Sequence, residues 1–150
     1  MELFGVWGRI IDVDLTTSKA VVRNLPPEVY RKFLGGRGLA AWILWKELGE
    51  RWSSVDPLSP DNILTILTGP LTSFYPGTKL SISGKSPLTN GVVGSTVSSE
   101  VAHEIKKAGY DGIIVRGRAS EPVYIYVEDD KVEIGDAKKL WGLSGLDLLK

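Results

Sequence analysis

The residues best suited to bind an anion begin with an arginine inside a run of glycines. Arg37 lies within Leu34-Gly35-Gly36-Arg37-Gly38-Leu39-Ala40. Glycines let a ligand approach the backbone closely, and a guanidinium can fork onto a phosphate or a carboxylate. A helix is predicted to begin just after these glycines, and its N-terminus would also favour an anion. The alternative is a tight corner between two helices with Arg37 paired to an acid, which the residue pattern alone favours.

A second cluster contains two lysines on either side of a short predicted strand. Lys79 precedes this strand and Lys85 follows it, and the stretch from Gly91 to Thr96 is rich in glycine and small residues. A helix N-terminus is predicted at Ser98. This arrangement suits a polyanionic ligand with a bound cation. The alternative is a glycine-rich hairpin loop with two solvated lysines, and here too the residue pattern alone favours the alternative.

Composition excludes several classes of function. The 18 Lys and Arg balance the 18 Asp and Glu, so no overall field favours nucleic acid or a membrane surface. No apolar run approaches the ~20 residues that span a bilayer. The chain has no cysteine, which excludes disulfides, thiolate metal sites and Fe–S ligation within these residues. The N-terminus lacks the pattern of a secretory signal, so the expected location is cytoplasmic.

The elements that must position these residues are a mixture of hairpins and helices. Alternating apolar residues and a polar turn predict a β-hairpin over 9–24. This mixture predicts an α+β fold rather than a parallel doubly wound sheet. The remaining predicted elements are helices over 26–35, 38–48 and 98–108, strands over 63–68, 79–83, 113–115, 123–127 and 132–134, a long turn over 69–77 and an ordered loop over 85–95.

A faint internal repeat and the end of the chain predict a truncated duplication. The hairpin of residues 10–22 resembles that of residues 124–134, and each is followed by a helix start. Ser144-Gly145-Leu146-Asp147 has the form of a capping box. The helix it begins reaches Lys150 after roughly two turns, without a stop signal. We therefore expect duplicated β-hairpin/helix units with the second truncated, and residues 1–150 as a single, partial N-terminal domain of a larger protein. The cut helix has an apolar face formed by Leu146, Leu148 and Leu149.

Eight short motifs, taken in order, resemble the N-terminal domain of the tungsten-containing aldehyde ferredoxin oxidoreductase family. The resemblance extends from about residue 5 to residue 145. The scarcity of labile side chains, with no Gln and one Met, also fits a thermophilic source. The motifs are Trp7-Gly8-Arg9, the glycine run 34–40, Pro57-Leu58-Ser59-Pro60, Gly69-Pro70-Leu71-Thr72, Lys85-Ser86-Pro87-Leu88-Thr89, Ala108-Gly109-Tyr110-Asp111, Pro122-Val123-Tyr124-Ile125-Tyr126 and Leu140-Trp141-Gly142.

The resemblance implies a cofactor-binding role. The first domain of the family is a duplicated α+β base that holds a tungsten (or molybdenum) bis-pterin, the tungstopterin, whose phosphates are bridged by Mg. Later helical domains, absent here, supply a [4Fe–4S] cluster through cysteines. The full enzymes oxidise aldehydes to carboxylic acids and pass electrons to ferredoxin. The resemblance therefore implies a small aldehyde substrate and ferredoxin as partners and leaves a homo-oligomer open, while this fragment alone is expected to be inactive and to contain no catalytic residue.

The resemblance also assigns cofactor contacts to particular residues. Lys79 falls where the family has a basic residue at the cofactor, and Arg37 and Lys85 are candidates to join it. Thr96, Val97 and Ser98 fall where backbone and small residues meet the cofactor, with the Thr96 carbonyl as the expected Mg ligand. The family often has Asn at position 96 and Gly at 98, so Ser98 adds a side chain where backbone approach is close. The alternative function is a standalone, non-catalytic binding or scaffold protein derived from this domain.

Overall fold

The computed structural model describes residues 4–74 and 77–148. These residues form a six-stranded mixed sheet in the order β2-β1-β6-β3-β4-β5, with a separate two-stranded sheet of β7 and β8. Among the strand pairs of these described residues, β1 and β6 pair in parallel and the other pairs are antiparallel. The bounds are β1 Arg9–Asp14, β2 Lys19–Asn24, α1 Pro27–Phe33, α2 Gly36–Leu48, η1 Gly49–Ser53, β3 Ile63–Thr68, β4 Lys79–Lys85, β5 Val92–Ser98, α3 Glu100–Lys107, β6 Gly112–Arg116, β7 Val123–Glu128, β8 Lys131–Asp136 and α4 Gly145–Leu148.

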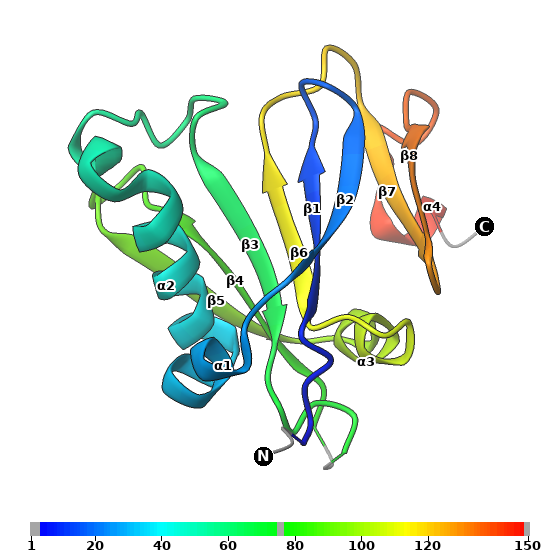
Figure 1. The fold of residues 1–150 in the computed structure, drawn as a ribbon. Helices are drawn as coiled ribbons and strands as arrows, with labels where there is room; N and C mark the ends of the chain where they lie inside the picture. Colours follow the sequence, from blue (N-terminus) through cyan, green and yellow to red (C-terminus); the bar gives the residue numbers. More distant parts are fainter. Residues whose placement is uncertain (1–3, 75–76, 149–150) are drawn as a thin grey trace.

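The sheet is covered on both faces (Figure 1). Helices α1 and α2 cover one face, while α3 and the β7–β8 hairpin cover the other. On the first side, Leu39, Ile43 and Leu44 of α2 pack in one hydrophobic core with Leu67 of β3. On the second side, Tyr110 lies in another core with residues of β1 and β6. Because both faces of the central strands are covered, the four residues from Ile10 to Val13 in β1 are all buried.

The predicted α+β class is confirmed, and so are both hairpins. In β7–β8 exposed and half-buried residues alternate, as expected for a hairpin with one face on a core. The serine half of the predicted capping box is present: the Asp147 amide donates to the Ser144 hydroxyl over 3.3 Å, and this hydroxyl donates to the Asp147 carboxylate over 2.7 Å. Residues 149 and 150, including one leucine of the predicted apolar face, lie outside the described residues, as do residues 75 and 76 of the predicted turn.

One strand differs from the sequence prediction. Residues 92–98 were expected to be mostly loop, followed by a helix from Ser98, but they form β5 in regular antiparallel register with β4. Glycine, serine and threonine fill most of this strand, so its sequence lacks the alternation of a half-buried strand. Its almost complete exposure as an edge strand explains why no such alternation is needed. Helix α3 then begins at Glu100, with Ser99 capping the amide of Val101.

None of the helices in residues 4–74 and 77–148 combines the length and apolar character that crossing a membrane requires.

Candidate anion-binding pocket

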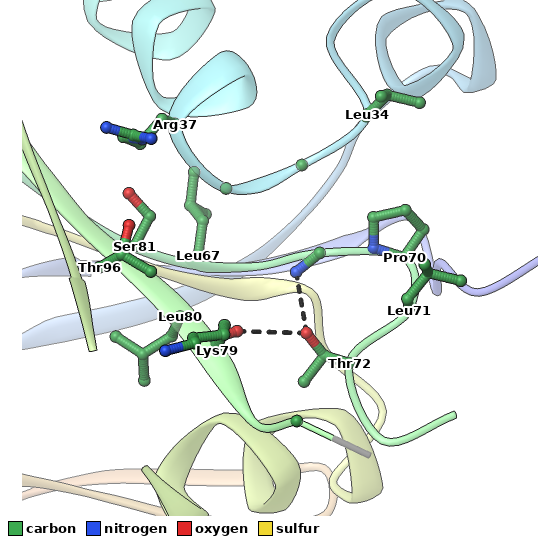
Figure 2. Close-up of a pocket in the computed structure, with 14 residues that line it drawn as sticks. Leu34, Arg37, Leu67, Pro70, Leu71, Thr72, Lys79, Leu80, Ser81 and Thr96 are labelled. Carbon is green, nitrogen blue, oxygen red and sulfur yellow. Dashed lines mark hydrogen bonds between the residues drawn. The ribbon is translucent and has the colours of Figure 1, made fainter. Parts of the chain in front are cut away.

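A pocket of about 470 Å³ opens between the α1–α2 corner and the ends of β3, β4 and β5 (Figure 2). We call it the anion pocket. Apolar side chains such as Leu67 and Leu80 contribute to its lining, which is mostly apolar in surface. Among the described lining residues two are cationic, Arg37 and Lys79, and none is acidic. The described residues of the lining are Leu34, Gly35, Gly36, Arg37, Leu67, Gly69, Pro70, Leu71, Thr72, Gly77, Lys79, Leu80, Ser81 and Thr96.

The glycine run brings the start of α2 close to the sheet. A Cβ on Gly35 would lie 2.6 Å from the Thr68 carbonyl oxygen, so any side chain there would push the helix away from β3. Gly36 has φ +50°, which favours glycine. The N-cap residue of α2 is Gly35, so it has no side chain to cap the first amides, and the first turn contains no acidic residue. The positive end of this thirteen-residue helix therefore faces the anion pocket.

Leu34 occupies a strained turn at the rim. Its φ and ψ are 61° and −70°, and the Gly35 amide donates to the Phe33 carbonyl over 2.8 Å. This is the geometry of a γ-turn that residues other than glycine rarely adopt. The Leu34 side chain is 64% exposed at the mouth of the pocket. A backbone of this kind costs about 1–3 kcal/mol in strain. The turn connects α1 to α2 through only Leu34 and Gly35.

Arg37 extends across β5 where that strand has a glycine. A Cβ on Gly94 would lie 2.7 Å from Cδ and 2.9 Å from Cγ of Arg37. The aliphatic stem therefore lies flat on the strand, with Ser81 and Thr96 nearby in the pocket lining (Figure 2). No ion pair joins Arg37 to an acidic side chain of the described residues, so the predicted pairing with an acid is not seen.

The register of β4 and β5 places Lys79 beside the other predicted contacts. Lys79 is opposite Ser98, and Ser81 is opposite Thr96. Opposite residues of an antiparallel pair point to the same face, with Cα atoms about 4.5–5.5 Å apart. Lys79, Thr96 and Ser98 are therefore neighbours on the face that α2 covers. Val97 is opposite Leu80 and points to the other face, so only its backbone is available on the pocket side.

The backbone of Thr96 points away from β4. In an antiparallel ladder hydrogen-bonded pairs alternate with non-hydrogen-bonded pairs. Ser99 donates to Thr78 over 2.9 Å at one end of the ladder, and Ser86 donates to Gly91 over 2.8 Å at the other. Counting inward from either end makes Ser81–Thr96 a non-hydrogen-bonded pair. Because β5 is an edge of the described sheet, the Thr96 carbonyl faces outward and is available to a ligand.

Two sequence-predicted features are not in the pocket. Lys85 begins the turn at the far end of β4, six residues from Lys79 or about 20 Å along the strand. It is only 3% exposed, and its ammonium donates to the carbonyls of Trp52 and Val55 over 2.5 and 2.6 Å. The helix expected to direct its N-terminus at an anion from Ser98 packs on the opposite face through Ile105. The helix N-terminus at the pocket belongs to α2 instead.

The residues present fit a phosphate-bearing ligand. Two cations without acidic neighbours, an uncapped helix N-terminus and an exposed backbone carbonyl favour an anion and one coordinated cation. The described residues contain no group of three or more His, Cys, Asp or Glu side chains placed to hold a metal. A metal ion here would therefore be held by backbone oxygens together with oxygens of the ligand itself.

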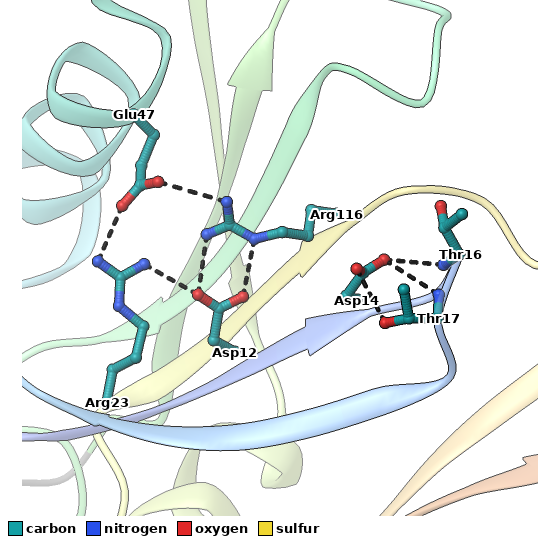
Figure 3. Close-up of polar contacts among 7 residues, drawn as sticks. All are labelled: Asp12, Asp14, Thr16, Thr17, Arg23, Glu47 and Arg116. Atoms are coloured by element: carbon teal, nitrogen blue, oxygen red, sulfur yellow. Dashed lines mark hydrogen bonds and ion pairs between the residues drawn. The ribbon is translucent and has the colours of Figure 1, made fainter.

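A second charged cluster, which sequence reasoning missed, lies at the other end of α2 (Figure 3). We call it the paired cluster; its members are Asp12, Arg23, Glu47 and Arg116. Arg116 grips both carboxylate oxygens of Asp12 at 2.8 Å, and Arg23 bridges Asp12 and Glu47 at 2.9 and 2.8 Å. Burial opposes the two positive charges, but the hydrogen bonds that the guanidinium groups donate to Asp12 and Glu47, together with the negative charge of those carboxylates, outweigh burial and raise the pKa of Arg23 and of Arg116. The signal was an acid inside the apolar run Ile-Ile-Asp-Val, which needs a buried partner.

The fold is an α+β domain, and its pocket is lined by two cations and by the start of α2. Residues 10–149 match the family described as "Aldehyde ferredoxin oxidoreductase, N-terminal domain". The chain belongs to this family.

Similar proteins support the assignment to this family, and each of them is much longer than this chain. The chain is 58% identical over 143 residues to an aliphatic sulfonate oxidoreductase, WOR-like subunit, of Pyrococcus furiosus, covering 95% of this chain and 23% of that protein. It is 44% identical over 142 residues to a tungsten-containing aldehyde ferredoxin oxidoreductase of the same organism, covering 93% and 23%. The active site complex BamBC of benzoyl coenzyme A reductase superposes with a TM-score of 0.89 at 36% identity, covering 97% and 22%. The chain thus spans about a quarter of the curated relatives it matches.

Proposed function

We propose that this chain forms one side of the binding site for the phosphates of a tungsten or molybdenum bis-pterin, within a longer oxidoreductase of this family. The observation that carries the proposal is the anion pocket itself. Its described lining has two cations and no acid, and the start of α2 opens into it. The proposed metal follows the names of relatives in Pyrococcus furiosus and Thermococcus kodakarensis, which are described as tungsten-containing.

The residues of this chain have separate tasks in the proposed site. Arg37 and Lys79 neutralise phosphate charge, and the amides at the start of α2 donate to phosphate oxygens. The Thr96 carbonyl, turned away from β4, is the proposed Mg ligand, and Ser98 lies beside Lys79 as a further polar contact. The bound cofactor would supply the oxidation–reduction chemistry, while these residues bind and orient it.

The remaining parts of the reaction belong to segments beyond this domain. This chain contains no cysteine, so a [4Fe–4S] cluster that passes electrons to ferredoxin requires thiolates from elsewhere. We propose an aldehyde as substrate and a carboxylic acid as product, following the family name. The relatives named for sulfonates and for benzoyl coenzyme A share this domain. Substrate choice is therefore a property of the other domains.

The experiment replaces Lys79 in the longer protein that carries this domain. Lys79→Ala should lower the bound tungsten or molybdenum severalfold while the free energy of unfolding changes by less than about 0.5 kcal/mol, because an exposed surface cation contributes little to folding. Lys19→Ala is the matched control, since Lys19 is also an exposed first residue of a strand. Normal metal content in Lys79→Ala, equal to that of the control, would refute the assignment.

A further inference from the structure

We infer that Thr72 is a positioning residue. It sets the distance between Lys79 and the turn from Gly69 to Thr72, which also lines the anion pocket. The inference deepens the proposed function and rests on it, because the position of Lys79 matters only if Lys79 binds an anion. The geometry that supports it is a single hydroxyl bridging two backbone groups. The Gly69 amide donates to Thr72 Oγ1 over 3.1 Å, and Thr72 Oγ1 donates to the Lys79 carbonyl over 3.2 Å (Figure 2).

The bridge lies where the ladder of β3 and β4 ends. Thr68 and Leu80 are the last paired residues, so Gly69 and Lys79 occupy the next position. The Thr72 hydroxyl joins that pair and extends the ladder through a side chain. A hydroxyl has one proton to donate and lone pairs to accept, so both of its uses are satisfied here. Thr72 is 8% exposed, which shields the bridge from competing water.

The bridge connects two parts of the pocket lining, the turn that follows β3 and the first residue of β4. Gly69 and Thr72 are also joined by a backbone bond, from the Thr72 amide to the Gly69 carbonyl over 3.2 Å, so the turn that carries Pro70 and Leu71 is closed on itself. Lys79 is the first residue of β4, and on its turn side the Thr72 hydroxyl fixes its carbonyl. Without the hydroxyl, the side-chain hydrogen bonds that join the turn from Gly69 to Thr72 to the Lys79 carbonyl are lost.

Other contacts keep the turn folded when the bridge is removed. Ser73 Oγ lies 2.7 Å from Nδ1 of His103 on α3, and the Phe74 amide donates to the Leu71 carbonyl over 3.2 Å. The β4–β5 ladder continues to hold Lys79 opposite Ser98. A substitution at Thr72 is therefore expected to alter local spacing while the fold persists.

The test uses the 150-residue chain, with inorganic pyrophosphate as the probe for a phosphate-bearing ligand. Thr72→Val removes the hydroxyl while conserving shape, and Thr72→Ser keeps the hydroxyl. Hydrogen exchange of the Gly69 amide reports the bridge, and an NMR titration of the Lys79 side chain reports pyrophosphate binding. We expect Thr72→Val to accelerate Gly69 exchange about tenfold, the effect of losing one buried hydrogen bond, and to weaken pyrophosphate binding about three- to tenfold. Thr72→Ser should restore both.

Each outcome separates this inference from the proposed function. Unchanged Gly69 exchange in Thr72→Val overturns the bridge. Faster exchange with unchanged pyrophosphate affinity shows a structural role only and overturns the positioning role. A wild-type chain that binds no pyrophosphate contradicts the proposed function and the positioning role together, whatever the exchange data show. If Thr72→Val does not fold, Thr72→Ala, which adds no branched methyl, is measured in the same way.

Discussion

The two ends of α2 carry charged clusters of opposite design. At the C-terminal end, the paired cluster joins two arginines to two carboxylates, and every charge has a partner within 3.3 Å. At the N-terminal end, Arg37 and Lys79 line the anion pocket with no acidic side chain among its described residues. The charges of the paired cluster are neutralised within the chain, whereas the two cations of the anion pocket have no acidic side chain beside them in its described lining.

The difference shows how pairing, rather than residue type, indicates function. Four charges on α2, β1, β2 and β6 that neutralise one another fix the helix to the sheet and thereby hold its N-terminus over the pocket. Cations without acidic partners, next to glycines that admit a close approach, are the reason for proposing an anion site at the pocket. Ion-pair networks such as the paired cluster become more stabilising, relative to hydrophobic burial, as the temperature rises.

The largest expected effect comes from opening the paired cluster. Asp12→Ala leaves two half-buried arginines without their shared carboxylate, and we expect the free energy of unfolding to fall by about 2–4 kcal/mol. Chemical denaturation measures it. Glu133→Ala, which removes an exposed pair with Lys131, is the control and should cost about 0–1 kcal/mol. Equal losses in the two variants would show that the paired cluster contributes no more than a surface ion pair.

A smaller effect is expected at Lys85, the lysine that the sequence wrongly grouped with Lys79. Lys85→Met keeps the aliphatic stem but removes the ammonium that binds the carbonyls of Trp52 and Val55, so we expect a loss of about 2 kcal/mol in unfolding free energy. Pyrophosphate binding by the chain should not change. Retained stability with lost pyrophosphate binding would instead return Lys85 to the site.

The smallest effect concerns Asp14, two residues from Asp12 on the same face of β1. A hydrogen bond from the Thr17 hydroxyl, 2.9 Å away, is the main cause that lowers the pKa of Asp14, and the amides of Thr16 and Thr17 add to it. A carboxyl whose pKa is lowered in the folded state stabilises the fold at pH values above its unfolded pKa of about 3.9. This contribution to stability is lost as the pH falls through the folded-state pKa.

Thr17→Val should therefore raise the pKa of Asp14 toward its usual value and weaken this acid dependence. NMR titration of the Asp14 carboxyl carbon measures it. Thr16→Val is the control, because Thr16 contributes only its amide to Asp14. An unchanged pKa in Thr17→Val would contradict the assigned cause.

Much of the fold could be predicted because local patterns and tertiary structure agree. The hairpin of β1 and β2 has a polar turn, β3 is a short and mostly buried strand, and α2 buries Leu39, Ile43 and Leu48. Strand β5 could not be predicted, because an exposed edge strand needs no apolar alternation and its glycine and serine content is typical of a loop. Its pairing with β4, the preceding strand, is not marked by any apolar pattern in the residues of β5.

The site was only partly predictable for the same reason. Arg37 and Lys79 carry charge and lie near glycines, so their types indicate an anion site, and the register of β5 brings Thr96 and Ser98 to them. Lys85 has the same side chain as Lys79, yet its burial under η1 depends on packing that composition does not encode. Thr72 and Asp12 act through hydrogen bonds whose partners lie far along the chain or across a turn.

Arg37 at the start of α2 and Lys79 at the start of β4 together form the proposed anion site. The most direct measurement is an NMR titration of the wild-type chain with pyrophosphate. Saturable shifts should concentrate on the amides of Gly36, Arg37, Lys79 and Thr96, weaken as salt rises, and vanish in the Arg37→Ala, Lys79→Ala double variant. Shifts that are absent, or that are scattered over exposed lysines such as Lys19 and unchanged in the double variant, would contradict the account.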